Sequence, residues 1–149
     1  MIKKNLILVS LIFFLTSCGF KPIYLKNTDL SFSIEQVNYK GDRDLNNLLK
    51  TNLIKYKNKK SDNKIYIEAN STYKKIVLSK DSTGEITSYQ LEAEVIFSIM
   101  PLNKKIKIRE KKIMNSKDDK FEEDRYERSV KQNFASSISN KLSTELIVN

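Results

Sequence analysis

The chain has 149 residues, of which 40% are hydrophobic, with a formal net charge of +9, no histidine, a single cysteine and three glycines. Without histidine it lacks the commonest general base and metal ligand, and three glycines scattered at positions 19, 41 and 84 cannot form a phosphate-binding loop. The length suits one domain with one core, and the composition argues against an enzyme and against a bound cofactor or metal.

Residues 1–17 have the pattern of an export signal. Two lysines precede an apolar run from Leu6 to Leu15, which is too short to span a bilayer stably. The run ends in Leu15-Thr16-Ser17-Cys18, which looks like the lipobox of bacterial lipoproteins and implies cleavage before Cys18 and acylation of this cysteine. Because stable anchoring needs more than one acyl chain, a Cys18 carrying several chains of the palmitate type would hold the protein on a membrane. Gly19 follows instead of the aspartate typical of inner-membrane retention, which favours the periplasmic side of the outer membrane; an ordinary signal peptide with a stray cysteine is the alternative.

Residues 18–30 are expected to form a lipidated N-terminus and tether, and residues 31–149 a single domain. The stretch from Ser31 to Tyr39 alternates like a strand, and a change of phase within it predicts a bulge. Gly41 ends this strand, and Asp42 is well placed to cap a following helix. That helix is predicted from apolar residues at three- and four-residue steps, namely Leu45, Leu48, Leu49, Leu53 and Tyr56.

Three strands and a second helix are predicted in the rest of the chain. Alternation of apolar and polar residues predicts the strands, and turn residues separate them at 81–84 and 101–103. The strands are expected from Ile65 to Leu78, from Tyr89 to Ile99, and from Ile106 to about Lys112. The last helix is predicted from apolar residues at every fourth position, which are Val130, Phe134, Ile138, Leu142 and Leu146.

The resulting order is β-α-β-β-β-α, which predicts an α+β domain. Strands with one apolar and one polar face indicate a four-stranded, mostly antiparallel sheet, and two amphipathic helices on one face would complete a two-layer sandwich. Tyr66 and Tyr73 are expected on the uncovered surface of this sheet, whereas Tyr89 is expected to begin the buried row.

Three features together resemble the family of LPS-assembly lipoproteins called LptE, in its alphaproteobacterial form. They are the stretch Cys18-Gly19-Phe20-Lys21-Pro22-Ile23-Tyr24, the element order, and a hairpin at Lys80–Gly84 followed by Tyr89-Gln90-Leu91. The resemblance implies a non-enzymatic lipoprotein of the outer membrane. Such a protein lies within the lumen of the β-barrel LptD as its plug and assembly partner, and binds lipopolysaccharide on its way to the outer leaflet.

The expected meander brings some of the lysines to one end of the sheet. Lys80 in the first hairpin, and Lys117 and Lys120 after the last strand, are predicted to share that end, whereas Lys104 and Lys105 are predicted at the other. The resemblance implies that basic residues at this hairpin and in the loop before the last helix bind the lipid A phosphates. The candidates for lipopolysaccharide binding are Lys80, Lys117 and Lys120, with Lys75 and Lys112 as extensions of the patch.

Two alternatives remain open at the level of sequence. A free-standing periplasmic binding lipoprotein, such as an accessory of an ABC transporter or an envelope-polymer binder, would share the anchor, the basic charge and the fold. The lysines are also consistent with a coding bias, because the chain is rich in lysine, asparagine and isoleucine. Nucleic acid is not an expected partner, since export would remove the protein from it.

Overall fold

The computed structural model describes residues 32–57, 61 and 63–147. The predictions for the export signal at 1–17, for Cys18 and for the tether at 18–30 lie outside the described residues. The described part begins just before the first strand and ends with the last helix.

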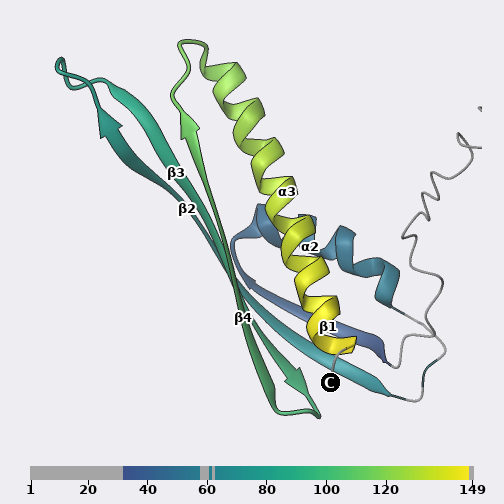
Figure 1. The fold of residues 1–149 in the computed structure, drawn as a ribbon. Helices are drawn as coiled ribbons and strands as arrows, with labels where there is room; N and C mark the ends of the chain where they lie inside the picture. Colours follow the sequence, from purple (N-terminus) through teal and green to yellow (C-terminus); the bar gives the residue numbers. More distant parts are fainter. Residues whose placement is uncertain (1–31, 58–60, 62, 148–149) are drawn as a thin grey trace, which may run out of the picture.

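The elements follow the predicted order. They are β1 (Ser33–Gly41), α2 (Arg43–Leu53) with a short 3-10 turn η2 (Ile54–Tyr56), β2 (Lys64–Lys80), β3 (Ile86–Met100), β4 (Lys104–Asn115) and α3 (Lys120–Ile147). The strands form one sheet in the order β1-β2-β3-β4, in which β1 is parallel to β2 and the other neighbours are antiparallel. Both helices lie on one side of the sheet, which gives the predicted two-layer α+β sandwich (Figure 1).

The core lies between the sheet and the two helices. The strict alternation in β3 turns one row of side chains toward the helices and leaves them almost completely buried, as the burial of Leu91, Val95 and Phe97 shows. They meet the apolar stripes of both helices, as predicted: Leu45, Leu49 and Leu53 from α2, and Val130, Phe134, Ile138, Leu142 and Leu146 from α3.

The two tyrosines expected on the uncovered face of the sheet lie on opposite faces. Tyr66 is on the uncovered face and about half exposed, at 49%. The prediction for Tyr73 is wrong, because Tyr73 lies in phase with Ile67 and Ala69 and packs against the core below the helices. Tyr89 begins the buried row of β3 as predicted, with 8% of its surface exposed.

The junction between β1 and α2 is built as the sequence predicts. A shift in register between Ile34 and Gln36 marks the bulge in β1. Gly41 ends the strand at a φ of +94°, and a Cβ at this position would lie 1.9 Å from the carbonyl oxygen of Ser71. Asp42 caps α2, since its Oδ1 accepts a hydrogen bond of 2.8 Å from the backbone N–H of Leu45.

Candidate anion-binding end of the sheet

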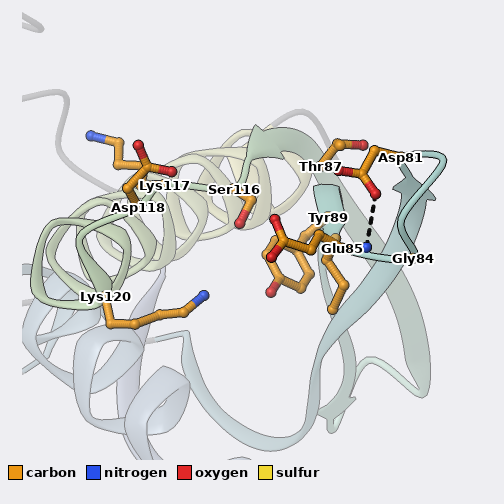
Figure 2. Close-up of a pocket in the computed structure, with 10 residues that line it drawn as sticks. Asp81, Gly84, Glu85, Thr87, Tyr89, Ser116, Lys117, Asp118 and Lys120 are labelled. Carbon is orange, nitrogen blue, oxygen red and sulfur yellow. Dashed lines mark hydrogen bonds between the residues drawn. The ribbon is translucent and has the colours of Figure 1, made fainter.

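An open cavity of about 770 Å³ lies at the end of the sheet where β2 turns into β3 and β4 leads into α3. The antiparallel register brings these segments together: Lys80 pairs with Ile86, and Ser88 pairs with Asn115. The residues that line the cavity are Asp81, Gly84, Glu85, Ile86, Thr87, Tyr89, Ser116, Lys117, Asp118 and Lys120 (Figure 2). The predicted meeting of the first hairpin with the loop before the last helix is therefore confirmed.

The turn between β2 and β3 is held by one aspartate. Oδ1 of Asp81 accepts hydrogen bonds from the backbone N–H groups of Thr83 and Glu85, both at 2.9 Å, and from the Thr83 hydroxyl at 2.7 Å. The bond to Glu85 is the dashed line in Figure 2. The hydrogen bond from the Thr83 hydroxyl lowers the pKa of Asp81; desolvation raises it, and the backbone N–H groups add to the lowering, so that the net shift is downward. One rim of the cavity is thus an ordered turn that carries a negative charge.

The loop between β4 and α3 is held by a buried glutamate. Glu123, in the first turn of α3, is only 2% exposed. Its Oε2 accepts hydrogen bonds from the Ser116 hydroxyl and from the backbone N–H of Lys117, both at 3.2 Å, and lies 3.5 Å from Nζ of Lys120. Its Oε1 accepts a hydrogen bond of 3.0 Å from Nζ of Lys75. One carboxylate therefore connects the loop, the helix and the middle of the sheet.

The ionisation of Glu123 follows from these contacts. Burial by itself would raise its pKa, because it disfavours the charged form. The hydrogen bonds from Lys75, from the Lys117 backbone and from Ser116, together with the charge of Lys75, outweigh burial and lower the pKa of Glu123 to about 2. The Glu123 carboxylate is consequently charged throughout the physiological pH range, and over that range it keeps its hydrogen bonds to the loop.

Lys75 lies beneath this glutamate on the covered face of the sheet. Its Nζ is 3.0 Å from Oε1 of Glu123 and 2.9 Å from Oε2 of Glu127, and it lies 4.4 Å from the centre of the Tyr89 ring. Glu127 also accepts a hydrogen bond of 2.9 Å from the Tyr73 hydroxyl. Burial lowers the pKa of Lys75, but the hydrogen bonds to Glu127 and Glu123 outweigh this and raise it. Lys75 therefore faces two carboxylates of α3 and does not line the cavity.

Sequence reasoning missed the partnership between Lys75 and the acidic residues of α3. Two signals were available. Lys75 is in phase with Ala69 and Tyr73 on β2, which places it on the helix side, and Glu123 and Glu127 are four residues apart on one face of α3. Their meeting depends on the angle at which α3 crosses the sheet, which neither signal contains.

The other candidate lysines differ in position. Figure 2 shows Lys120 extending into the cavity toward Tyr89, whereas the Lys117 side chain points outward. Nζ of Lys117 lies 5.6 Å from the centre of the Tyr126 ring. Lys80 stands at the base of the turn and Lys112 lies opposite Leu91 on β4; both are exposed and neither lines the cavity. Lys104 and Lys105, at the start of β4, belong to the opposite end of the sheet as predicted.

The cavity lining carries both signs of charge. The lining includes two lysines, Lys117 and Lys120, and three carboxylates, those of Asp81, Glu85 and Asp118. The lysines supply ammonium groups for an anion, and the carboxylates accept hydrogen bonds from hydroxyl groups. The arrangement suits a ligand that bears phosphate and hydroxyl groups together better than a simple polyanion. In the described part of the chain, no group of three or more acidic or cysteine side chains is arranged to hold a metal ion.

The fold is similar to those of several bacterial lipoproteins whose structures have been solved. The crystal structure of rare lipoprotein B from Shewanella oneidensis matches with a TM-score of 0.57 and 13% identity, covering 75% of this chain and 93% of that one. The solution structure of an uncharacterized lipoprotein B from Nitrosomonas europaea matches with a TM-score of 0.55 and 15% identity, over 79% and 86% of the two chains. A putative lipoprotein from Caulobacter crescentus matches with a TM-score of 0.52 and 11% identity, over 80% and 90%.

These similarities define the fold class, since the identities are too low to carry more than the architecture. No protein-family model matches the sequence, and no curated protein matches it. Among the helices that the structure describes, none has the length and apolar character needed to cross a bilayer.

Proposed function

We propose that this chain is a lipoprotein anchored to the outer membrane through an acylated Cys18, and that it is the plug and assembly partner of an LptD-type β-barrel. In this role it binds lipopolysaccharide and takes part in its insertion into the outer leaflet. The observation that carries the proposal is the cavity at the hairpin end, which is lined by Lys120 and Lys117 together with the ordered turn around Asp81. The lipobox-like residues before Cys18 and the fold shared with other bacterial lipoproteins support it.

The lining of this cavity fits the head group of lipid A better than it fits lipid phosphate alone. Lysine offers a mobile point charge to a phosphate, and the carboxylates of Glu85 and Asp118 accept hydrogen bonds from sugar hydroxyls. The carboxylates also limit the attraction to anions that bear no hydroxyl groups. The buried Glu123 contributes indirectly, because it holds the loop that presents Lys117 and Lys120.

The first test is recovery of the native protein from outer membranes in mild detergent, with identification of its bound chains by mass spectrometry. A near-stoichiometric β-barrel of the LptD type is the expected result. Recovery of the acylated protein alone would contradict the plug assignment, and would favour a free-standing periplasmic binding lipoprotein that needs no barrel.

The second test concerns the ligand. Lys117→Asp combined with Lys120→Asp should weaken binding of lipid A by about tenfold or more, because each reversal replaces an attraction to phosphate with a repulsion. A matched control reverses two lysines of the α2 region, Lys50→Asp with Lys55→Asp, which are exposed and remote from the cavity. Equal affinity in the two folded double variants would contradict the assignment of the cavity.

A further inference from the structure

The turn between β3 and β4 exposes large apolar side chains. Met100 is 63% exposed and Leu102 is 59% exposed, and they flank Pro101 at the tip of the turn. Tyr66 pairs with Met100 across the sheet and is also half exposed. Tyr66 and Met100, but not Leu102, line a shallow hollow of about 360 Å³ on the uncovered face, formed by β1, β2 and β3. Isolated apolar residues are ordinary at surfaces, whereas here two of them flank one turn beside an exposed tyrosine. A second group, Ile76, Val77 and Leu78, is exposed toward the other end of β2.

This turn lies at the end of the sheet where the chain enters the domain. Ser33 at the start of β1 pairs with Lys64 at the start of β2, and β2 in turn pairs through Tyr66 with Met100. The β2–β3 hairpin is at the other end, one length of β2 away, which for 17 residues is about 55 Å. Figure 1 shows the β3–β4 turn and the start of β1 together at the end opposite the β2–β3 hairpin.

The N-terminal segment limits how far this end can be from an anchored Cys18. Cys18 is 15 residues before Ser33, and a chain of that length reaches at most about 50 Å when fully extended. The acyl anchor would therefore keep the start of the domain within about 50 Å of the bilayer surface. The same tether does not favour the β2–β3 hairpin, which lies a further strand length away.

The charges at this end do not oppose an anionic lipid surface. Among the residues that the structure describes at this end, Glu35 pairs with Lys64, Glu68 with Lys40, and Glu145 with Lys104. Lys105, next to the turn, has no ion-pair partner among the residues that the structure describes. Apolar side chains beside a lysine, with a tyrosine at the edge, form the combination that partitions to the boundary between head groups and acyl chains.

We propose that the β3–β4 turn is a second membrane contact, which inserts Met100 and Leu102 into the head-group boundary of the bilayer that carries the Cys18 anchor. The occupant of this apolar surface is thus lipid and not another protein. The inference depends on the acyl anchor of the proposed function, but not on lipopolysaccharide binding or on the barrel. Its consequence is an orientation: the turn end of the domain lies at the bilayer surface that carries the anchor, and the cavity lies at the opposite end of the sheet.

The test uses the acylated protein reconstituted into vesicles of phosphatidylethanolamine and phosphatidylglycerol, without a barrel. A spin label is attached either at Leu102→Cys or, as the matched control, at Ser82→Cys in the β2–β3 turn; an acylated Cys18 thiol does not react with the label. For each site the label's accessibility to oxygen, which concentrates in lipid, is divided by its accessibility to a water-soluble nickel chelate. This ratio is expected to be at least about threefold higher at residue 102 than at residue 82. Adding Met100→Asp should lower the ratio at residue 102 toward the control value.

The outcomes separate the two proposals. Equal, water-like ratios at both sites in protein whose N-terminal mass shows acylation would overturn the membrane contact and leave the anchor intact. A label at residue 102 that reaches lipid even in protein without acyl chains would uphold the contact and show that it forms independently of the anchor. If the label is shielded from both reagents only when a β-barrel is added, the surface binds protein and the inference is wrong.

Discussion

Replacing Glu123 with glutamine removes one negative charge from the most enclosed polar cluster at the hairpin end while keeping the size of the side chain. In the native protein this carboxylate accepts hydrogen bonds from Lys75, from the Ser116 hydroxyl and from the Lys117 backbone. Hydrogen bonds to a charged group contribute about 1.5–3 kcal/mol, and the displacement of its pKa from 4.5 to about 2 corresponds to about 3 kcal/mol at neutral pH. We therefore expect Glu123→Gln to lower the free energy of unfolding by about 2–3 kcal/mol at pH 7.

Urea unfolding followed by circular dichroism measures this loss. With a denaturant dependence of about 1.5 kcal/mol per molar urea, the midpoint should fall by roughly 1.5 M. The matched control is Glu122→Gln, one residue earlier in α3. The Glu122 side chain is 37% exposed, and its ion-pair partner among the described residues is Arg125, one turn away, so its replacement should change stability by less than about 0.5 kcal/mol.

The pH dependence has a definite sign. The folded-state pKa of Glu123 is below its unfolded value, so the stabilisation is fully present above about pH 4.5 and is lost as the pH falls toward about 2. The difference between the wild type and Glu123→Gln should therefore shrink across that window, while other carboxylates contribute equally to both proteins. A Glu123→Gln protein no less stable than Glu122→Gln, with an unchanged difference between pH 5 and 2, would refute the role assigned to Glu123.

Two further predictions concern the frame that carries the site. Gly41→Ala should reduce the free energy of unfolding by at least about 3 kcal/mol in a thermal or urea melt, because a φ of +94° is strained for alanine and the new Cβ would meet the Ser71 carbonyl. Gly84→Ala has a similar φ but open space around the new Cβ, so it should lose only about 1 kcal/mol. Equal losses in the two variants would contradict the role of the Ser71 carbonyl. Arg109→Ala removes the ion pairs of this half-exposed arginine to Glu92 and Glu94 on the uncovered face. Because Glu94 keeps its pair with Lys107 and Glu92 its pair with Lys111, the loss should be less than about 1 kcal/mol and should be smaller still at high salt. A large loss that is insensitive to salt would contradict this.

Much of the architecture follows from periodicity and local chemistry. The alternation from Tyr89 to Ile99 determines which face of β3 is buried, since successive side chains of a strand point to opposite sides. Asp42 as a helix cap and the bulge near Gln36 also follow from neighbouring residues alone. The order of the strands brings the first hairpin and the loop before the last helix to one end, so the position of Lys120 relative to the hairpin was predictable as well.

The tertiary structure alone decided which side chains each charged residue interacts with. Lys75 and Glu123 are 48 residues apart, and they pair because α3 crosses the sheet at one particular place and angle. That crossing geometry results from how the apolar stripes of α3 and α2 pack on the sheet. The periodicity of the sequence specifies which face of a helix is apolar, but not where along the sheet that face packs. For the same reason the sequence predicted a basic end, whereas the folded chain encloses Lys75 between carboxylates and surrounds the cavity with both signs of charge.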